Sequence, residues 1–291
     1  MMNGFVLIDK PAGMTSFQIT AAVRRKFGQK KAGHAGTLDP LATGVLPVFI
    51  GQATRLIDLI PDRKKRYLAD FMLGITTDTL DNTGTVLTDQ PFSHVTKQKL
   101  QEAIGAFTGE ITQTPPMFSA LKKDGVPLYK LARAGVDVER RARKTTIDKI
   151  ELVAFDGMCG SLDVVCDKGT YIRTLIDDIG LYLHCGAIMT GLRRTASNGF
   201  SADQCVPLDV FLENPPETFL QPPDKALQDY PAVFVTPKQA VRFQNGGELD
   251  RTRLRLPVDA PIYRVYGGDT FLGLGEQTPA ALKPRCVQHN S

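Results

Sequence analysis

The residue best placed to do chemistry in this sequence is Asp39, the one carboxylate in a loop that has glycines on both sides. The loop spans residues 33–46 and reads GHAGTLDPLATGVL. Gly33 and Gly36 permit backbone angles that a side chain would forbid, so the loop can turn sharply and present His34 and Asp39. No cation neighbours Asp39, so the carboxylate, if buried, needs an arginine from elsewhere or stays protonated. When ionised, it would act as a nucleophile or as a base.

A simpler interpretation of Asp39 is that it caps a short helix that begins at Pro40. The two interpretations are compatible, because a cap also fixes the position of a carboxylate. After this loop, the apolar run 45–50 predicts a buried strand that ends at Gly51.

The second candidate is Arg173, an arginine set among apolar residues. The pattern after Gly169 predicts a helix that ends near Gly186 and turns inward the apolar residues Ile172, Leu175, Ile176, Ile179 and Leu183. An arginine in such a place needs a buried anion and Asp39 needs a cation, so pairing the two satisfies both. The alternative is an exposed pair of Arg173 with Asp177, one turn along the helix and worth only about 0.2–0.5 kcal/mol.

The third candidate is Tyr67, at the start of a segment with strand periodicity. Residues 66–73 alternate so that one face carries Tyr67, Ala69, Phe71 and Leu73. A tyrosine in such a strand is more often part of the core, but a basic cluster at 63–66 precedes this one. Lysine and arginine pair with phosphates and aromatic rings stack on bases, which favours a polyanionic partner. Five such basic clusters occur, at 24–26, 30–31, 63–66, 140–144 and 193–194.

The elements that must position these residues follow from apolar periodicity and from capping residues. Further strands are expected at residues 5–8, 150–155, 162–166, 233–235, 262–266 and 271–275. Helices are expected after caps at Ser16 and Thr96, over about 53–60, and for one or two turns at 238–243. The helices capped by Ser16 and Thr96 would bury Ile19, Val23 and Phe27, and Leu100, Ile104 and Phe107. Residues 76–81 read as a polar loop.

The composition limits the class of protein. The chain of 291 residues is 42% hydrophobic, enough for one large domain with a small one attached. Its longest apolar run is too short for a membrane span and its start is unlike a signal peptide, so we expect a cytoplasmic protein without membrane contact. Its five cysteines include no C-x-x-C pair and its four histidines are scattered, so no metal is expected.

The charge is distributed unevenly along the chain. Residues 1–200 carry 26 Lys and Arg against 20 Asp and Glu, residues 201–231 carry one against six, and residues 232–291 carry eight against five. The acidic middle is rich in proline, which is typical of a linker or a packed connection between domains.

The Asp39 loop resembles the catalytic-aspartate motif G-H-x-G-x-L-D-P-x-A-x-G-x-L of the TruB family, the bacterial tRNA pseudouridine-55 synthases. Residues 10–16 are similar to the family's K-P-x-G-x-T-S, residues 113–121 to its Q-x-P-P-x-[YF]-S-A, and residues 168–173 to its K-G-T-Y-I-R. Residues 76–81 are similar to its T-x-T-x-D segment. These segments span most of residues 5–195.

The resemblance implies a role for each candidate. Asp39 would be catalytic and Arg173 its partner, while His34 would fill the place of a flipped base. Tyr67 would stack on the target uracil, and Tyr171 and Leu192 would form part of the base pocket. Lys10, Gly33 and Gly36 would support the loop, with a phosphate contact as the alternative role for Lys10. Residues 122–144 would form an RNA-gripping insertion, for which composition alone allows an ordinary helical hairpin as the alternative.

The resemblance also implies an α+β pseudouridine-synthase fold over residues 1–230, with a mixed, mostly antiparallel sheet flanked by helices. Residues 231–291 would form a small β-rich, PUA-like RNA-binding domain, or else a structural β-domain. The sequence itself supports strands and helices without a regular βαβ alternation.

The implied function is isomerisation of uridine to pseudouridine at position 55 in the T-loop of tRNA, by base flipping and an essential aspartate. This reaction needs no redox cofactor, metal or second substrate. The T-arm stem-loop would be the partner, and we expect a monomer that needs no other protein. The alternatives are a synthase acting on another RNA and a non-catalytic tRNA-binding or folding protein.

Overall fold

The computed structural model describes residues 2–62 and 64–289, and the contacts within it divide the chain into two compact units. The first unit contains Met1–Pro40, Gly44–Arg63 and Ser197–Ser291. The second unit contains Leu41–Thr43 and Lys64–Ala196. Each unit is described by itself below.

The N-terminal part of the first unit is a small mixed sheet on which helices pack. Its strands are β1 (Gly4–Lys10), β2 (Ala32–His34), β3 (Thr43–Ile50) and β14 (Val206–Pro207). β3 runs antiparallel to β1 and β2, and β14 runs parallel to β1. Helix α1 (Ser16–Lys26) buries Ile19 and Val23, with Phe27 beyond its end, against Val6, Ile8 and Val48. The expected strands and the expected helix face are therefore confirmed.

The cap of α1 differs from the prediction by one residue. Thr15 is the cap: its hydroxyl accepts a hydrogen bond from the Gln18 N–H, and the Gln18 side chain accepts one from the Thr15 N–H. This reciprocal arrangement satisfies two donors that a helix start leaves open. Ser16 is the first helical residue, which leaves its hydroxyl available for the loop described below.

The rest of the first unit connects this sheet to a second one. The helix expected at 53–60 is a 3-10 helix, η1 (Gly51–Leu59). The proline-rich stretch is a packed connection, because Phe211, Ala226 and Leu227 are buried. Its elements are β13 (Phe200–Ser201), η2 (Ala202–Gln204), α5 (Leu208–Glu213), η3 (Pro216–Phe219) and η4 (Pro223–Leu227).

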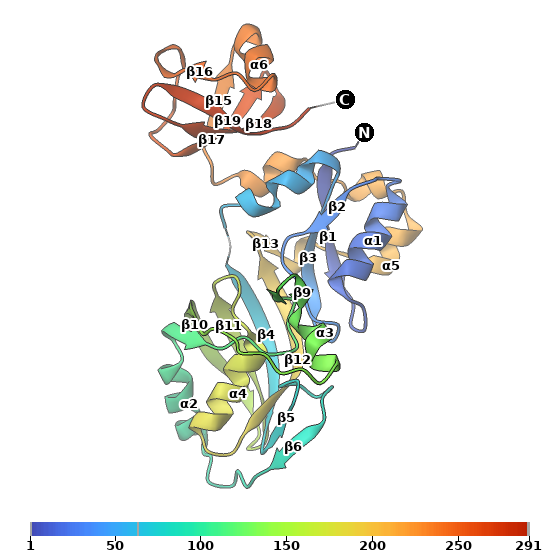
Figure 1. Ribbon diagram of the computed structural model, residues 1–291, viewed down its shortest axis with the longest axis vertical. Helices are drawn as coiled ribbons and strands as arrows, with labels where there is room; N and C mark the ends of the chain where they lie inside the picture. Colours follow the sequence, from blue (N-terminus) through green and yellow to red (C-terminus); the bar gives the residue numbers. More distant parts are fainter. Residues whose placement is uncertain (1, 63, 290–291) are drawn as a thin grey trace. The chain divides into compact units, whose positions relative to one another are not determined.

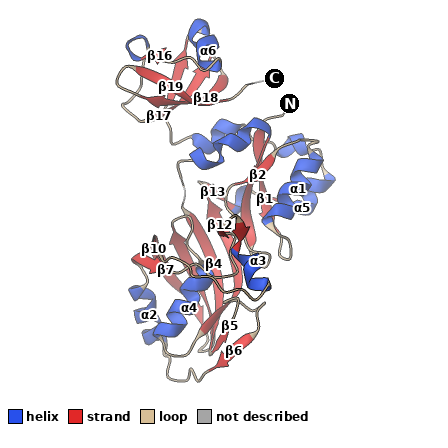
Figure 2. Ribbon diagram, in the orientation of Figure 1, coloured by secondary structure: helices blue, strands red, loops and turns tan. Residues whose placement is uncertain are grey.

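The C-terminal part of the first unit is a five-stranded sheet in the order β15-β17-β18-β19-β16, with one helix at its side (Figure 2). Its elements are β15 (Ala232–Val235), α6 (Pro237–Gln244), β16 (Leu249–Asp250), η5 (Arg251–Arg253), β17 (Ile262–Gly267), β18 (Thr270–Gln277) and β19 (Ala281–Val287). The three predicted strands and the helical turns are present. β16 and β19 were not predicted.

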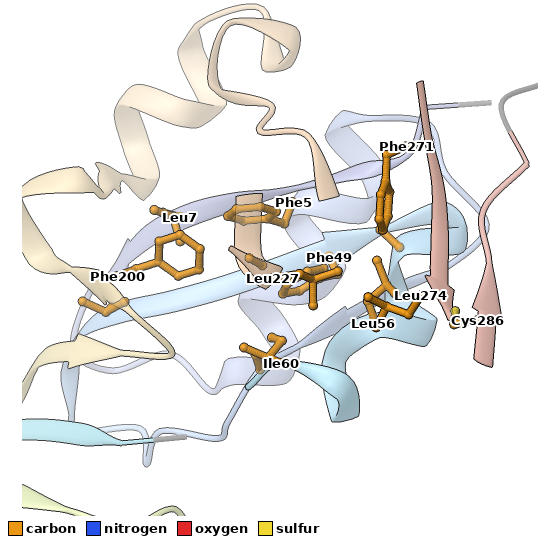
Figure 3. Packing of buried hydrophobic residues seen from close by; sticks show 14 residues of the cluster. Phe5, Leu7, Phe49, Leu56, Ile60, Phe200, Leu227, Phe271, Leu274 and Cys286 are labelled. Carbon is orange, nitrogen blue, oxygen red and sulfur yellow. The ribbon is translucent and has the colours of Figure 1, made fainter. Parts of the chain in front are cut away.

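One apolar cluster joins the two sheets of the first unit (Figure 3). Phe271 and Leu274 of β18 and Cys286 of β19 belong to the same cluster as Phe49 and Leu56. Burying aromatic side chains is among the largest apolar contributions to stability, so this cluster ties the C-terminal sheet to the N-terminal one.

The second unit is built on strands in the order β12-β4-β11-β10-β7, with β4, β11, β10 and β7 paired antiparallel. They are β4 (Lys65–Leu73), β7 (Gly109–Gln113), β10 (Arg143–Phe155), β11 (Cys159–Cys166) and β12 (Ala187–Ser197). Helices α2 (Lys97–Ala106) and α4 (Ile172–Tyr182) pack together on this sheet (Figure 1). Thr96 caps α2 as predicted, and the predicted apolar face of α4 is buried.

Two short hairpins complete the second unit. β5 (Ile75–Thr77) pairs with β6 (Val86–Asp89), and β8 (Lys122–Lys123) pairs with β9 (Val126–Pro127), which is followed by α3 (Leu128–Arg133). Residues 122–144 therefore form a β-hairpin, one short helix, irregular chain and the start of β10, so the helical-hairpin alternative is wrong. In the described residues of both units, no helix is long and apolar enough to cross a membrane.

Candidate active site

The Asp39 loop is held by hydrogen bonds to the backbone of Leu38 and Pro40, the residues on either side of Asp39. On one side, the Leu38 N–H donates to the Ser16 hydroxyl at 2.8 Å, and that hydroxyl donates to the Leu38 carbonyl at 3.0 Å. On the other side, the Pro40 carbonyl accepts from the Gly13 N–H at 2.8 Å and from the Lys10 ammonium at 3.2 Å. The backbone that carries Asp39 is therefore fixed from both sides by residues 10–16.

Lys10 is completely buried, and its ammonium also donates to the Pro11 carbonyl at 2.8 Å. A buried ammonium must be hydrogen-bonded to be tolerated, and the bonds to these backbone carbonyls help to meet that need. Residues 35–42 contain no helix, so the interpretation of Asp39 as a helix cap is wrong.

The two glycines of the loop are needed for different reasons. Gly36 has a φ of +98°, in the left-handed region that favours glycine. Gly33 has no such angle, but a Cβ added to it would lie 3.0 Å from Cδ1 of Ile57. The prediction of unusual backbone angles is therefore correct for Gly36 and wrong for Gly33, where the side chain of Ile57 packs closely against the glycine. His34 is the last residue of β2 and pairs with Val48 of β3.

In the second unit, Arg173 forms a buried cluster with a carboxylate that the sequence analysis placed in a polar loop. Its Nε lies 3.8 Å from Oδ2 of Asp81, and the two side chains are each only 5% exposed. Its Nη1 donates to the Thr79 carbonyl at 2.9 Å and its Nη2 to the Phe118 carbonyl at 2.8 Å. Arg173 does not pair with Asp177, so that alternative is wrong for the described chain.

Asp81 is itself fixed by the threonines around it. Its Oδ1 accepts hydrogen bonds from the Thr79 hydroxyl at 2.7 Å and from the Thr83 N–H at 3.0 Å. The Thr83 hydroxyl donates to the same oxygen. A carboxylate that accepts from several donors beside a guanidinium is held in one orientation. The T-x-T-x-D spacing was the feature of the sequence that pointed to Asp81, because its threonines supply hydroxyl groups that donate hydrogen bonds.

Tyr171 is positioned by Gln113, another residue that the sequence analysis did not single out. The Gln113 side chain accepts from the Tyr171 N–H at 3.1 Å and donates to the Tyr171 carbonyl at 3.2 Å. Tyr171 is the N-cap residue of α4. The side-chain amide of Gln113 thereby fixes the backbone just before Arg173. Gln113 is the first residue of the Q-x-P-P segment noted in the sequence.

Tyr67 and Leu192 lie on strands of the same sheet. Tyr67 is buried on β4 opposite Val164 of β11, and the predicted alternation along β4 is confirmed. Leu192 is half-buried on β12.

The predicted site residues are divided between the two units. The second unit contains Tyr67, Tyr171, Arg173 and Leu192, and the first contains Lys10, Gly33, His34, Gly36 and Asp39. The pairing of Asp39 with Arg173 stays a prediction.

Two cations of the basic cluster before Tyr67, Lys64 and Arg66, are paired with carboxylates. Lys64 lies 2.7 Å from Oδ2 of Asp148 and 2.8 Å from Oδ1 of Asp167, whose hydrogen bonds raise the Lys64 pKa. Arg66 lies 2.6 Å from Oδ2 of Asp163 and lowers the pKa of that carboxyl group through its hydrogen bond. Lys65 is buried, and Arg63 lies outside the described residues. The expectation that this cluster faces a polyanion is therefore not supported at Lys64 and Arg66.

Comparison with known proteins decides the family. Residues 24–172 match the N-terminal domain of the TruB family pseudouridylate synthases. Residues 173–228 match the tRNA pseudouridylate synthase B C-terminal domain, and residues 231–287 match the pseudouridine synthase II TruB C-terminal domain. The chain belongs to the TruB family. The resemblance found in the sequence is confirmed.

Relatives within the TruB family cover nearly the whole chain. The tRNA pseudouridine synthase B of Azoarcus sp. (strain BH72) is 44% identical over 98% of this chain and 94% of its own. The tRNA pseudouridine synthase B of Clostridium perfringens (strain 13 / Type A) is 43% identical over 97% of each chain.

Solved structures confirm the pseudouridine-synthase fold. A chain from a Cbf5-Nop10-Gar1 complex superposes with a TM-score of 0.73 at 28% identity, over 98% of this chain and 84% of that one. A chain of an H/ACA RNP bound to a substrate RNA containing 2'-deoxyuridine gives 0.74 at 25% identity over the same shares. The α+β class with a β-rich C-terminal part is therefore established.

Proposed function

We propose that this TruB family protein isomerises uridine to pseudouridine at position 55 in the T-loop of tRNA. The observation that carries the proposal is the fixed backbone on both sides of Asp39, where Leu38 and Pro40 are bound by residues 10–16. A catalytic carboxylate must be held within a fraction of an ångström of its working position. The relatives named tRNA pseudouridine synthase B support tRNA as the substrate.

The reaction breaks the C1′–N1 glycosidic bond of uridine and forms a C1′–C5 bond to the same uracil. The proton on C5 leaves and N1 gains one, so atoms and electrons balance without a second substrate. Asp39 acts as the nucleophile or as the base that opens this sequence. The target base is stacked within a folded T-loop, so it must first be turned out into the site, which costs a few kcal/mol.

The other predicted residues have roles in this proposal that surround the flipped base. Tyr67 stacks on the uracil, Tyr171 and Leu192 form part of its pocket, and His34 fills the place that the base leaves. Arg173 pairs with Asp39 and keeps it ionised. Lys10, Gly33 and Gly36 act by holding the loop and do not take part in the chemistry.

The protein acts in the cytoplasm as a monomer on the T-arm stem-loop, and it needs no other protein in this proposal. Residues 231–291 serve as an additional RNA-binding domain. The assemblies named for the two solved structures favour a second candidate, a synthase that acts on another RNA with partners. Those chains are 28% and 25% identical to this one, whereas the tRNA pseudouridine synthase B of Azoarcus is 44% identical.

The test uses a T-arm stem-loop RNA with tritium at C5 of its uridines. Formation of the C1′–C5 bond must release that tritium to water. We expect one label to be released per RNA, and none when uridine 55 alone is replaced. Release from other uridines, or no release despite tight binding, would refute the assignment.

The matched variant is Asp39→Asn, which keeps the shape of the side chain and removes its charge. We expect it to release no tritium while RNA binding stays close to that of the wild type. Appreciable product from this variant would show that Asp39 is not the catalytic carboxylate.

A further inference from the structure

The first unit contains a pocket of about 430 Å³ that has no part in the reaction proposed above. Its lining comes from four separate segments: the chain before β1, the start of η4, the turn that leads into β18 and the chain after β19. Phe271, one of the lining residues, also belongs to the apolar cluster that joins the two sheets of this unit (Figure 3). A ligand in this pocket would therefore touch segments that belong to both parts of the first unit.

The charge of the pocket is negative. Asp224 of η4 and Asp269 of the turn between β17 and β18 both line it, and its lining residues include no lysine or arginine. In the part of the chain that the structure describes, neither carboxylate forms an ion pair. Two carboxylates at one hollow without a counter-charge create a potential that attracts cations.

Cations that lie close to Asp224 in the chain or in space are bonded to other groups. Lys225 follows Asp224, but its ammonium donates to Oε1 of Gln221 at 2.8 Å. Arg264 donates through Nη1 to the Tyr266 hydroxyl at 3.2 Å, and that hydroxyl donates to Oδ2 of Asp224 at 2.7 Å. Burial, together with the bond to Asp224, raises the pKa of Tyr266 to about 12, so this partner of Asp224 is a neutral hydroxyl.

A second, independent observation at the same pocket is the side chain of Gln288. It lines the pocket and is only 2% exposed. Its Nε2 donates to the Gln52 carbonyl at 3.4 Å, which fixes the end of the amide that faces that carbonyl. Its Oε1 is buried and has no hydrogen-bond donor among the described residues. A buried acceptor without a donor is costly, and a donor that enters the pocket would supply the missing bond.

We propose that this pocket binds a linear organic diamine or polyamine. The groups without a counter-charge or a donor, which are Asp224, Asp269 and the Gln288 oxygen, are all acceptors. An alkylammonium group carries three N–H donors and no acceptor, so it matches them. Two ammonium groups pair with the two carboxylates, and the alkyl chain between them lies against Pro222, Pro223 and Phe271.

An organic cation fits this pocket better than a metal ion does. In the described residues, no group of three or more His, Cys, Asp or Glu side chains could hold a metal ion. Calcium takes six to eight oxygen ligands, and magnesium demands a nearly ideal octahedron of them. Two carboxylates beside an apolar wall do not meet either need, whereas they suit an ion that is charged at its ends and apolar between them.

The proposal predicts that the amine stabilises the folded chain. A diamine bound to Asp224 and Asp269 would connect the proline-rich stretch to the C-terminal sheet. A ligand that binds the folded state and not the unfolded chain raises the melting temperature. At a concentration of putrescine one hundred times its Kd, we expect a rise of about 5 °C.

The test titrates the full chain by calorimetry with three compounds of equal length. Putrescine has an ammonium group at each end of a four-carbon chain, n-butylamine has one, and 1,4-butanediol has none. We expect putrescine to bind one site per chain, n-butylamine to bind at least about tenfold more weakly, and 1,4-butanediol to show no binding. Magnesium chloride at the same ionic strength controls for screening of charge.

Variants of the pocket identify the groups that hold the amine. Asp269→Asn should raise the Kd for putrescine by about tenfold and abolish its advantage over n-butylamine, because one carboxylate is then left. Asp269 is exposed, so this variant should fold. Gln288→Met keeps the size of the side chain and removes the buried acceptor, so it should also weaken binding, and melting without ligand checks its fold. Asp229→Asn is the control, an exposed carboxylate of the same proline-rich stretch outside the pocket, and it should bind putrescine like the wild type.

Three results would overturn the proposal. The first is binding of putrescine by Asp269→Asn that equals binding by Asp229→Asn. The second is a rise in melting temperature with magnesium chloride as large as that with putrescine, which would show screening alone. The third is n-butylamine binding as tightly as putrescine, the result expected if the pocket takes a single lysine side chain of a partner protein. Because the titration uses no RNA, its outcome does not depend on whether the chain releases tritium.

Discussion

The Asp39 loop of the first unit and the Arg173 cluster of the second hold their charged residues in different ways. The backbone beside Asp39 is fixed by several bonds to main-chain groups, made by Lys10, Gly13 and Ser16. Arg173 is held by contacts that include the buried carboxylate of Asp81 and the carbonyls of Thr79 and Phe118. The first arrangement fixes backbone groups by hydrogen bonds, and the second holds a buried guanidinium by contacts that include the ion pair with Asp81. We therefore expect mutations in the loop to affect mainly activity, and mutation of Asp81 to affect mainly stability.

The largest effect is expected from Asp81→Ala, which removes the carboxylate that faces Nε of Arg173. Breaking a buried ion pair by deleting one partner costs about 3–5 kcal/mol, so the free energy of unfolding should fall by that amount. Urea denaturation followed by circular dichroism measures it. Asp89→Ala, an exposed carboxylate on β6, should change stability by less than about 0.5 kcal/mol. Equal stability of the two variants would show that the buried pair contributes little.

A smaller loss of stability, with a larger loss of activity, is expected from Ser16→Ala. It removes the hydroxyl that bonds both backbone groups of Leu38, which should cost about 1–3 kcal/mol. Because Asp39 directly follows Leu38 in the chain, the loss of these bonds should also displace Asp39. The rate of tritium release at saturating RNA should then fall by about tenfold or more.

The control for Ser16→Ala is Gln18→Ala, which breaks the capping box of α1 without touching the loop. It should destabilise the helix by about 1 kcal/mol and leave the rate nearly unchanged. If both variants lose activity in proportion to their stability, the loop contact has no special part in positioning Asp39.

The two loop glycines should differ in whether a second mutation can rescue them. Gly36→Ala should cost about 1–2 kcal/mol, because a side chain disfavours its backbone angle whatever surrounds it. Gly33→Ala should cost less, and Ile57→Val should restore it by removing the Cδ1 that the new methyl group would meet. The same Ile57→Val change should not rescue Gly36→Ala. Denaturant unfolding of the four variants tests this.

Much of the fold could be predicted because local pattern and tertiary environment agree. The alternation along β4, the apolar face of α4 and the Thr96 cap of α2 each depend on residues within one element. The cap of α1 was wrongly assigned to Ser16, because serine and the neighbouring Thr15 are equally good capping residues. Only the position of Gln18 three residues after Thr15 distinguishes them.

The contacts that sequence reasoning missed join residues far apart in the chain. Arg173 meets Asp81 from 92 positions away, whereas the local alternative, Asp177, was visible in the sequence. Lys64 and Arg66 were counted as available cations because their carboxylates come from β10, β11 and the chain after β11. The charge pattern along a sequence does not show which charges are neutralised in space. For this reason Lys64 and Arg66 were counted as available cations although each is paired.

The smallest change in stability is expected from mutation of Asp178, which lies on the same helix as Arg173. Burial, with the charge of Asp177 beside it, raises the Asp178 pKa to about 6. Between the unfolded pKa near 4 and this value, the folded protein binds more protons than the unfolded chain, so stability falls as the pH rises through that range. Above it, the chain carries the full cost of a partly buried charge.

Asp178→Asn removes this cost, so the variant should melt about 2 °C higher than the wild type at pH 8. The difference should shrink as the pH falls from 6 towards 4, because the wild-type carboxyl group is then neutral in the folded protein. Asp89→Asn serves as the control and should show no such trend, since its side chain is exposed. Melting curves at several pH values measure both. A difference that stays constant with pH would mean that packing, and not charge, sets the stability of this part of α4.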